Sequence, residues 1–467
     1  MARAKKETAL TPEERLQAAL VPDWEWPYKL PENWCWTRIG MVSNFERGIT
    51  FPAAAKEAAP TEDNIPCLRT ANVQENLEID DMIYVNRDFM KGNIAKLVRE
   101  NDIIMSSANS RELVGKSSLV THIPFPMTFG GFVLNIRAKE MSSKYLFYFL
   151  RHEFLAGKFI GESSQTTNIA NINTTTLGNY EIPLPPLPEQ QRIVDRIESL
   201  FAKLDEAKEK AQAVVDSFET RKAAILHKAF TGELTAKWRE EHGVGMESWK
   251  THELAECFEI VSGIQKTPAR SPKDNPVPYL TVANVYRGRI DLSDIRYFEV
   301  TSKEIEKLKL QDKDILIVEG NGSGNEIGRC AIWHNELPLC IHQNHIIRMR
   351  RKTADILPEY ALHYLNSEAG KSIMRERSKT TAGLFNLSAG KIKTIPLPMA
   401  SLDEQSEIIH LIDSLLEKEQ WTKEAAEAVL DQIDLMKKSI LARAFRGELG
   451  TNDPSEESAV ELLKQII

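Results

Sequence analysis

The feature that most constrains this fold is a long internal repeat. The stretch that opens with PLPPLPEQQ at Pro183 and closes with GEL at Leu234 returns from Pro396, where it opens with PLPMASLDEQ, and closes with GEL at Leu449. Its Glu-Gln and Gly-Glu-Leu landmarks recur 215 positions further along the chain. A repeat with so long a period indicates a duplicated structural unit rather than a solenoid. The segments between the two copies therefore have to be compared as well.

Those intervening segments also correspond to each other. IPCLRTANV at residues 65–73 matches VPYLTVANV at residues 277–285, and ENDIIM at residues 100–105 matches DKDILI at residues 312–317, both at an offset of 212. Short apolar or alternating runs of this kind predict strands, and the helical spacing of apolar residues over 143–157 predicts a helix. The sequence therefore predicts a tandem duplication, in which each copy is an α+β domain followed by a long helix.

Each long helix carries one apolar stripe. After Pro188 the apolar residues alternate at spacings of four and three, which predicts a coiled-coil seam on a helix of about 40 residues. The predicted seam is Ile193, Ile197, Leu200, Leu204, Ala207, Ala211, Val214, Phe218 and Ile225, broken by Arg221. Shifted by 215 it becomes Ile408, Ile412, Leu415, Glu419, Thr422, Ala426, Val429, Ile433, Met436 and Ile440.

A solitary helix of this length with one apolar stripe must find a partner. We expect the two copies to pair as an antiparallel coiled coil about a pseudo-twofold axis, with one domain at each end. The alternative is that each helix packs only on its own domain. The predicted organisation is an N-terminal extension over 1–30, domains over 31–182 and 244–395, a long helix over 183–243, and a second long helix with a C-terminal tail over 396–467.

The N-terminal extension itself shows a helix signal. Thr11 stands where an N-cap belongs and Glu14 occupies the capping-box position, which predicts a helix from Pro12 to Leu20. An arm with Trp24, Trp26 and Tyr28 follows, and we expect these aromatic side chains to pack on the next domain.

Composition excludes some functions and permits others. No apolar run approaches the roughly 18 residues of a membrane span, and the N-terminus lacks the apolar core of a secretory signal. The five cysteines form no CxxC pair, so we expect free, buried thiols in a reducing cytoplasm. The net charge is −8, yet residues 395–467 hold 15 acidic and 7 basic residues, whereas 249–394 holds 18 and 22. An acidic total therefore does not exclude a local surface that binds nucleic acid.

The combined motifs resemble a known family over nearly the whole chain. The PLPPLPEQ entry to a long helix, the endings AILHKAFTGEL and SILARAFRGEL, LPENWCW at residues 30–36 and the two divergent domains are similar to the specificity subunit of type I restriction–modification systems. The resemblance implies two target recognition domains, each reading one half of a split DNA site. It also implies helices that set the gap and dock methyltransferase subunits. Two departures are the long extension before Leu30 and Ser401-Leu402-Asp403 before the second Glu-Gln.

Catalytic motifs are missing from the sequence. There is no GxxxxGK[ST] phosphate-binding loop, no Asn/Asp-Pro-Pro-aromatic motif, no HExxH and no GxSxG. Gly320–Gly324 is glycine-rich but lacks the lysine of a phosphate-binding loop, so it predicts a recognition loop. His342 and His345 have no further candidate ligands nearby, so no metal site is predicted. We therefore expect a non-catalytic subunit, with an unrecognised enzyme site and a non-DNA-binding protein scaffold as the alternatives.

Candidate DNA-reading residues are those that can pair with base edges or phosphates from loops and strand ends. Asn72 and Asn284 match each other, which suits capping of a turn better than discrimination of bases. In the first domain the candidates are Arg47, Thr50, Arg69, Thr70, Ser106, Ser107, Asn109, Ser110, Arg111, Lys116, Gln165, Thr166 and Thr167. In the second they are Gln265, Lys266, Asn321, Ser323, Asn325, Arg329, Lys379, Thr380 and Thr381.

The repeated helix ends predict where partner subunits dock. The candidate docking residues are Glu189, Gln190, Phe230, Glu404, Gln405 and Phe445. The resemblance implies double-stranded DNA, two copies of the methyltransferase subunit and up to two copies of the restriction subunit as partners. It implies no cofactor in this chain, and S-adenosylmethionine, ATP and Mg in the partner subunits.

Overall fold

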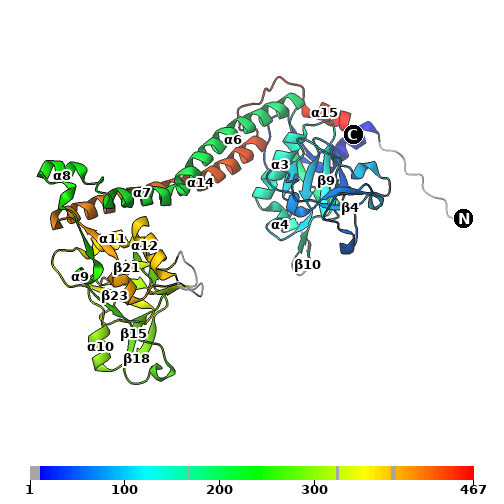
Figure 1. Cartoon of the computed structure of the whole chain (residues 1–467). Helices are drawn as coiled ribbons and strands as arrows, with labels where there is room; N and C mark the ends of the chain where they lie inside the picture. Colours follow the sequence, from blue (N-terminus) through cyan, green and yellow to red (C-terminus); the bar gives the residue numbers. More distant parts are fainter. Residues whose placement is uncertain (1–10, 163, 167–168, 322–325, 380–384) are drawn as a thin grey trace. The chain divides into compact units, whose positions relative to one another are not determined.

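The computed structural model describes residues 11–162, 164–166, 169–321, 326–379 and 385–467. The chain divides into two compact units (Figure 1). Unit 1 comprises residues up to Lys210 together with Val429–Ile467, and unit 2 comprises Ala211–Ala428. The long helices α6 (Leu187–Asp216) and α14 (Leu402–Phe445) therefore contribute residues to both units.

Unit 1 is built on an antiparallel sheet of order β2-β9-β5-β7, formed by Ser43–Arg47, Val133–Ala138, Ile103–Ser106 and Ser117–Leu119. A second sheet, β4-β3-β8, is formed by Ile83–Asn86, Asn64–Leu68 and Thr128–Phe129, with β3 and β8 parallel. Smaller sheets are β1-β12 (Cys35–Arg38, Glu181–Leu184) and β10-β11-β6 (Ser164–Thr166, Ile169–Asn171, Ala108–Asn109). The predicted strands of this domain are all present, some in shortened form.

Unit 2 repeats the same strand order. Its main sheet is β14-β23-β19-β21, formed by Phe258–Ser262, Ile346–Arg351, Ile315–Val318 and Cys330–Ile332. The second sheet is β18-β15-β22 (Arg296–Glu299, Pro276–Leu280, Ile341–His342), again with one parallel pair. The small sheets are β13-β25 (Lys250–Glu253, Pro396–Met399), β20-β24 (Gly320–Asn321, Phe385–Asn386) and β16-β17 (Val285–Tyr286, Arg289–Ile290). Two matching α+β domains confirm the predicted duplication.

Helices cover these sheets at matching places. In unit 1 they are α2 (Ile39–Val42), α3 (Ser143–Leu155), α4 (Lys158–Glu162) and α5 (Thr174–Gly178). In unit 2 they are α9 (Leu254–Cys257), α10 (Ser302–Leu308), α11 (Pro358–Asn366), α12 (Glu368–Ser378) and α13 (Ala389–Lys393). The apolar faces of α3 and α11 belong to the largest core of their units, together with residues of the long helices.

The first long helix is interrupted once. It consists of α6 and α7 (Phe218–Phe230), with Ser217 between them. Helical hydrogen bonds continue across the junction: the Ser217 amide donates to the Ala213 carbonyl at 3.1 Å, and the Arg221 amide donates to the Ser217 carbonyl at 3.0 Å. The predicted helix of about 40 residues is therefore present with a local irregularity.

In each unit the two long helices run antiparallel. In unit 1, Asp205 of α6 pairs with Lys437 of α14 at 2.5 Å, and Lys208 pairs with Asp434 at 3.7 Å. In unit 2, the two charged interruptions of the predicted seams meet each other, and Arg221 pairs with Glu419 at 2.5 Å. A charged pair inside an apolar seam favours one register over its neighbours.

The predicted seam is wrong at three positions of α14. Val429 and Met436 are 45% and 48% exposed, and Thr422 is exposed as well. Lys437 and Leu441 are buried instead. An ideal helix drifts by about 20° per heptad against a strict 3.5-residue repeat, so the buried stripe moves to the next position over several turns.

The first and last described helices meet in unit 1. Helix α1 (Pro12–Ala19) is capped by Thr11 and Glu14 in a capping box, as predicted, and it packs against α15 (Ala459–Ile466), which Figure 1 shows beside it. The arm that follows α1 is only partly packed. The Tyr28 ring contacts Trp36 at 4.9 Å, which confirms the expectation for Tyr28.

Trp24 departs from that expectation, because it is 84% exposed. It lies in a single 3-10 turn, residues 23–25, between Pro22 and Trp26, and this turn directs its ring away from the domain. Trp26 is 39% exposed, and its indole N–H donates to the Val21 carbonyl at 2.9 Å.

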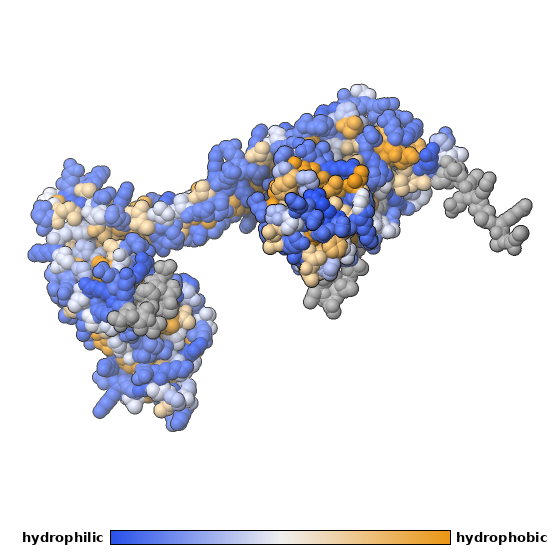
Figure 2. All heavy atoms as spheres, turned by 45° about the vertical axis from the view of Figure 1, so that its right-hand side comes forward, coloured by the Kyte–Doolittle hydropathy of each residue, from blue (hydrophilic) through white to orange (hydrophobic). Residues whose placement is uncertain are grey.

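Figure 2 shows hydrophobic residues gathered in patches on the surface of unit 1.

The repeated Gly-Glu-Leu motif has a conformational cause. Helices α7 and α14 end at Phe230 and Phe445, and the glycine two residues later, Gly232 or Gly447, has φ of 81° or 73°. A left-handed residue just past a helix end is a position that favours glycine. The short helix α8 (Ala236–His242) follows the first motif.

The five cysteines are free and buried, as predicted. Burial raises the pKa of the Cys35 and Cys330 thiols to about 12. Among the described residues, no helix is long and apolar enough to cross a membrane.

Candidate nucleic-acid interface

Three chain segments of unit 1 meet at one junction beyond the strand ends. The Ile49 amide, after β2, donates to the Phe129 carbonyl at 2.8 Å, and the Gly130 amide donates to the Leu68 carbonyl, at the end of β3, at 2.9 Å. A Cβ atom on Gly48 would lie 2.0 Å from the Gly130 carbonyl oxygen, so only glycine permits this approach. The junction brings together two candidate pairs that are distant in the sequence, Arg47 with Thr50 and Arg69 with Thr70.

A cavity of about 500 Å³ opens at this junction. Its lining residues are Ile49, Thr50, Phe51, Ala53, Lys56, Arg69, Thr70, Ile83, Gly130, Gly131, Phe132 and Val133. Thr50 and Lys56 are exposed, whereas the Arg69 side chain is 34% exposed and pairs with Asp81 at 3.2 Å. Arg47 is exposed at the end of β2. Three of the DNA-reading residues proposed from the sequence, Thr50, Arg69 and Thr70, therefore line the same cavity.

Unit 2 has the same junction with different side chains. The Ile264 amide donates to the His342 carbonyl at 3.0 Å, and the Gln343 amide donates to the Leu280 carbonyl at 3.0 Å. A Cβ atom on Gly263 would lie 2.2 Å from the His342 carbonyl oxygen. The candidates Gln265 and Lys266 follow directly and are exposed.

His342 supports the junction from inside. Its Nδ1 lies 2.9 Å from the Ile346 carbonyl oxygen, to which it donates, and burial lowers the pKa of this imidazole to about 4. His345, three residues later, is exposed. The described part of the chain holds no group of three or more His, Cys, Asp or Glu side chains arranged to hold a metal ion.

The loop after β5 lies beside the junction in unit 1. Ser107 donates from its amide and its hydroxyl to the Phe132 carbonyl, both at 3.0 Å. Ser110 and Arg111 are exposed, whereas Lys116 is partly buried and donates to Gln74.

Ser106 departs from the prediction. Its side chain is fully buried and its hydroxyl accepts a hydrogen bond from the Asn109 amide group at 3.0 Å. Ser106 therefore supports the loop and cannot reach DNA without local opening.

A small sheet gathers further candidates. In unit 1, Asn109 of β6 pairs with Ala170 of β11, and β11 pairs with β10, which holds Gln165 and Thr166. In unit 2, Asn321 of β20 pairs with Phe385 of β24. Lys379 caps the end of α12 and is exposed. The remaining candidates Thr167, Ser323, Asn325, Thr380 and Thr381 lie outside the described residues.

Several polar residues of these loops hold the backbone in place. Asn72 accepts from the Arg69 amide and Asn284 accepts from the Thr281 amide, both at 2.8 Å, so the predicted turn caps are confirmed. Arg329 is only 13% exposed at its side chain and pairs with Glu326 at 2.9 Å. It also donates to the Val282 carbonyl at 2.8 Å, so it is committed to internal contacts.

The strand arginines near residue 350 are structural. Arg350 pairs with the buried Asp314 at 2.7 Å, and the matching pair in unit 1 is Arg137 with Asp102 at 2.8 Å. Arg348 is buried and pairs with Glu259 at 2.8 Å. Both arginines are therefore engaged in contacts within the domain.

The Glu-Gln motifs depart most clearly from the sequence expectation. Glu189, Gln190, Glu404 and Gln405 are all fully buried. In unit 2, Glu404 accepts from Arg239 at 2.6 Å, Thr235 at 2.8 Å and the Trp249 indole at 2.9 Å. The matched glutamines bind backbone, because Gln190 accepts from the Ser142 amide and Gln405 accepts from the Leu357 amide, both at 2.9 Å.

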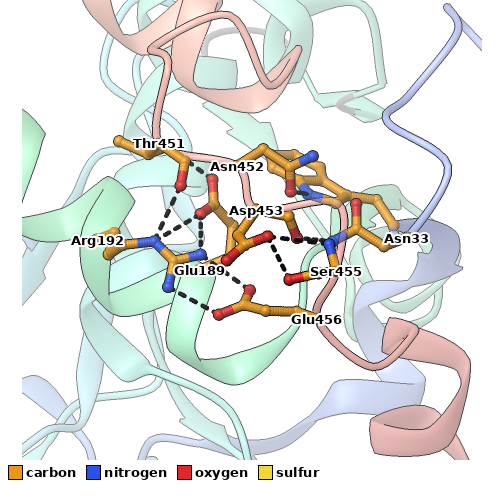
Figure 3. A network of polar contacts seen from close by, with 9 residues as sticks. Asn33, Glu189, Arg192, Thr451, Asn452, Asp453, Ser455 and Glu456 are labelled. Carbon is orange, nitrogen blue, oxygen red and sulfur yellow. Dashed lines mark hydrogen bonds and ion pairs between the residues drawn. The ribbon is translucent and has the colours of Figure 1, made fainter.

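In unit 1, the C-terminal segment contributes to the polar contacts around the buried glutamate, Glu189 (Figure 3). Thr451 donates to Glu189 at 2.6 Å, and Arg192 bridges Glu189 at 2.7 Å and Glu456 at 2.8 Å. Asn33 donates to the Asp453 carbonyl at 3.0 Å. Residues 451–456 thus occupy in unit 1 the place that residues after Leu234 occupy in unit 2.

The two repeated phenylalanines also face inward. Phe445 is fully buried and its ring lies 5.4 Å from Tyr145 and 5.2 Å from Phe149. Phe230 packs edge-on against Tyr360 and Tyr364. All six predicted docking residues therefore have internal contacts, and the four polar ones are inaccessible to a partner.

Two pseudo-equivalent α+β domains, each with polar loops around one strand-end junction, define a protein with two related candidate binding surfaces. The model for the type I restriction modification DNA specificity domain matches residues 31–215 and again 246–430, so the chain belongs to that family. As a specificity subunit it recognises DNA sequence, and it is the non-catalytic component of such a system.

Known relatives align over almost the full chain. The EcoKI specificity subunit of Escherichia coli (strain K12) is 30% identical, covering 94% of this chain and 96% of that protein. The StySPI specificity subunit of Salmonella potsdam is 27% identical and covers 90% of each. The crystal structure of the HsdS subunit from Thermoanaerobacter tengcongensis has the same fold, with a TM-score of 0.60, 19% identity and coverage of 91% of this chain and all of that one.

Proposed function

We propose that the domain over 31–182 reads one half of a bipartite, asymmetric double-stranded DNA site and that the domain over 244–395 reads the other. The observation that supports this is the shared junction. Its backbone hydrogen bonds are the same in both units, while the side chains around it differ, with Thr50 facing Gln265 in the alignment and Arg69 facing Thr281. One scaffold with two sets of polar side chains suits two unlike half-sites.

A domain exchange tests this proposal. The chain is co-expressed with its methyltransferase subunit, and methylated sites are mapped across the host genome. Replacing residues 31–182 with the matching domain of another family member should change one half of the methylated sequence and leave the other half intact. The same exchange at 244–395 should have the complementary effect. An unchanged methylated sequence after either exchange contradicts the proposal.

The long helices are proposed to set the gap between the half-sites. Their antiparallel contacts within each unit, such as Asp205 with Lys437 and Arg221 with Glu419, support a paired spacer. One heptad adds about 10 Å of helix, which corresponds to about three base pairs at 3.4 Å each. Inserting one heptad into both helices should lengthen the gap by about three base pairs without altering the bases read. Altered bases with an unaltered gap would refute the spacer role.

Partner subunits are proposed to dock on the outer faces of the long helices rather than on the Glu-Gln motifs. Trp421 is 71% exposed on the unit 2 part of α14, and Leu435 is 63% exposed on the unit 1 part. Exposed apolar side chains on otherwise polar helices are anchors that fit protein partners. Two copies of the methyltransferase subunit, and up to two copies of the restriction subunit, would complete the complex.

Native mass spectrometry tests this assembly. Trp421→Ser should weaken retention of a methyltransferase copy, whereas Trp24→Ser, at the 84% exposed tryptophan of the N-terminal arm, serves as the matched control. Full retention by the Trp421 variant refutes the docking surface.

The cofactors S-adenosylmethionine, ATP and Mg are proposed to bind the partner subunits, and the assembled complex is proposed to act in the cytoplasm. The alternative is a protein scaffold that does not bind DNA. The two differ in salt dependence, because each phosphate contact contributes about −0.9 to the slope of log affinity against log salt concentration. A complex without any salt-dependent DNA binding would favour the scaffold.

A further inference from the structure

The third chain segment at each junction is a tight turn. It contains none of the DNA-reading residues that were proposed from the sequence. In unit 1 this turn is Gly130-Gly131-Phe132, between β8 and β9. In unit 2 it is Gln343-Asn344-His345, between β22 and β23. Each turn is closed by a hydrogen bond from the residue after it, Val133 to Gly130 at 2.8 Å and Ile346 to Gln343 at 2.9 Å. The two turns therefore have the same backbone construction.

Phe132 and His345 occupy the same position in these turns. The Phe132 carbonyl accepts from the Ser107 amide at 3.0 Å, and the His345 carbonyl accepts from the Glu319 amide at 2.9 Å. Ser107 and Glu319 follow the matched strands β5 and β19. The pair Phe132 and His345 is separated by 213 positions, whereas β5 and β19 match at 212, so a single fixed offset does not align the two domains.

Both side chains project outward from an anchored backbone. Phe132 is 66% exposed, while its backbone carbonyl accepts a hydrogen bond from Ser107 of the neighbouring loop. His345 is exposed as well. The position thus presents an apolar ring in one domain and a polar ring in the other, on the same scaffold.

The surroundings of Phe132 fit DNA. It lines the cavity of about 500 Å³ together with Thr50, Lys56, Arg69 and Thr70. Two cationic side chains and two hydroxyls suit phosphates and base edges, and an apolar ring among them suits the thymine methyl, the one apolar group on a base edge in the major groove.

We propose that residue 132 and its counterpart 345 are matched specificity-determining positions: Phe132 contacts the methyl group of a thymine in the first half-site, and His345 contacts a base edge in the second. This inference rests on the proposed half-site reading. It adds a residue pair that neither the repeat offset nor polarity identifies, since phenylalanine cannot hydrogen-bond a base.

Uracil substitution isolates the methyl group. The complex with the methyltransferase subunit is titrated with duplexes in which single thymines of the mapped first half-site are replaced by uracil. For the unaltered protein we expect one such replacement to weaken binding roughly four-fold, because burial of one carbon group contributes about 0.8 kcal/mol. Phe132→Ala should bind both duplexes equally, as expected when one partner of a coupled pair is already absent.

Phe125→Ala is the matched control, since Phe125 is 38% exposed in the same domain and does not line the cavity. It should retain the four-fold methyl effect. His345→Ala should relax one position of the second half-site in methylation mapping and leave the first half unchanged.

Failure of this inference is distinguishable from failure of the proposed function. A Phe132→Ala complex that keeps the full methyl effect, or a first half-site without any thymine on either strand, refutes the role of Phe132. In both cases a bipartite methylated site would still be found. Absence of a bipartite site for the unaltered protein would instead overturn the proposed function.

Discussion

The buried pair of Arg239 and Glu404 gives the sharpest stability prediction. Their side chains are 8% and 1% exposed, and Glu404 also accepts from Thr235 and Trp249. Glu404→Gln keeps the size of the side chain but removes its charge. The guanidinium of Arg239 is then left without a counter-charge out of water, and we expect unit 2 to lose about 3–5 kcal/mol of stability.

The matched substitution in unit 1 should cost less. Glu189→Gln removes the same residue type, but the Arg192 side chain is 37% exposed and keeps Glu456 as a second partner at 2.8 Å. Water and Glu456 then stabilise the positive charge of Arg192, so we expect unit 1 to lose only about 1 kcal/mol of stability. Glu417→Gln, at an exposed position of the same helix as Glu404, should change stability by less than about 0.5 kcal/mol.

Native-state hydrogen exchange measures these effects unit by unit. A two-domain chain is not expected to unfold in one step, so a single melting temperature would merge the two units. Exchange-protected amides of β19 and β23 report unit 2, and those of β5 and β9 report unit 1. The double variant Arg239→Met with Glu404→Leu should recover part of the loss, because an apolar pair needs no counter-charge, although Thr235 and Trp249 lose their acceptor. Equal losses for Glu404→Gln and Glu189→Gln would refute this reasoning.

Three further predictions concern other contacts. Truncation after Gly450 removes Thr451, which donates to Glu189, together with helix α15, so it should destabilise unit 1 by several kcal/mol and leave exchange in unit 2 unchanged. Arg221→Glu should destabilise the helix pair in unit 2 by about 1 kcal/mol, and Glu419→Arg in the same chain should restore it, as hydrogen exchange of the unit 2 amides would show. Since the folded-state pKa of His342 lies at about 4, below its unfolded value, its stabilising contribution is complete above about pH 6.5 and is lost as the pH falls towards 4. Urea titrations at several pH values should show a loss of about 3 kcal/mol, which His342→Asn should abolish.

Much of the fold could be predicted from local patterns. Strands β3, β5 and β9, helix α3 and the capping box at Thr11 lie where alternation, helical periodicity and capping chemistry placed them. Asn72 and Asn284 were also predicted correctly as turn caps, because matched residues in divergent domains indicate a shared backbone requirement. These features depend on neighbours within a few residues, which a sequence displays directly.

The candidate site could be predicted only in part. Thr50, Arg69 and Thr70 do line one cavity, yet Ser106 is buried and Arg329 is committed to Glu326 and Val282. A polar side chain on a loop can turn toward solvent or back toward the backbone, and its local sequence is the same in both cases. Burial depends on which distant segment packs beside the loop.

By itself, the sequence determined the duplication, the family and the two long helices, because repeats, motifs and periodicity are properties of the order of residues. The tertiary structure decided which repeated residues are reachable. The Glu-Gln motifs recur since each unit needs a buried acceptor, and in unit 1 one donor to Glu189 is Thr451, more than 250 positions away, while Glu456 pairs with its other donor, Arg192. The tertiary structure also showed that Phe132 and His345 occupy equivalent positions in the two domains. Their backbone hydrogen bonds establish this equivalence, which no constant sequence offset reveals. Contacts between distant segments make these assignments, and only the folded chain brings such segments together.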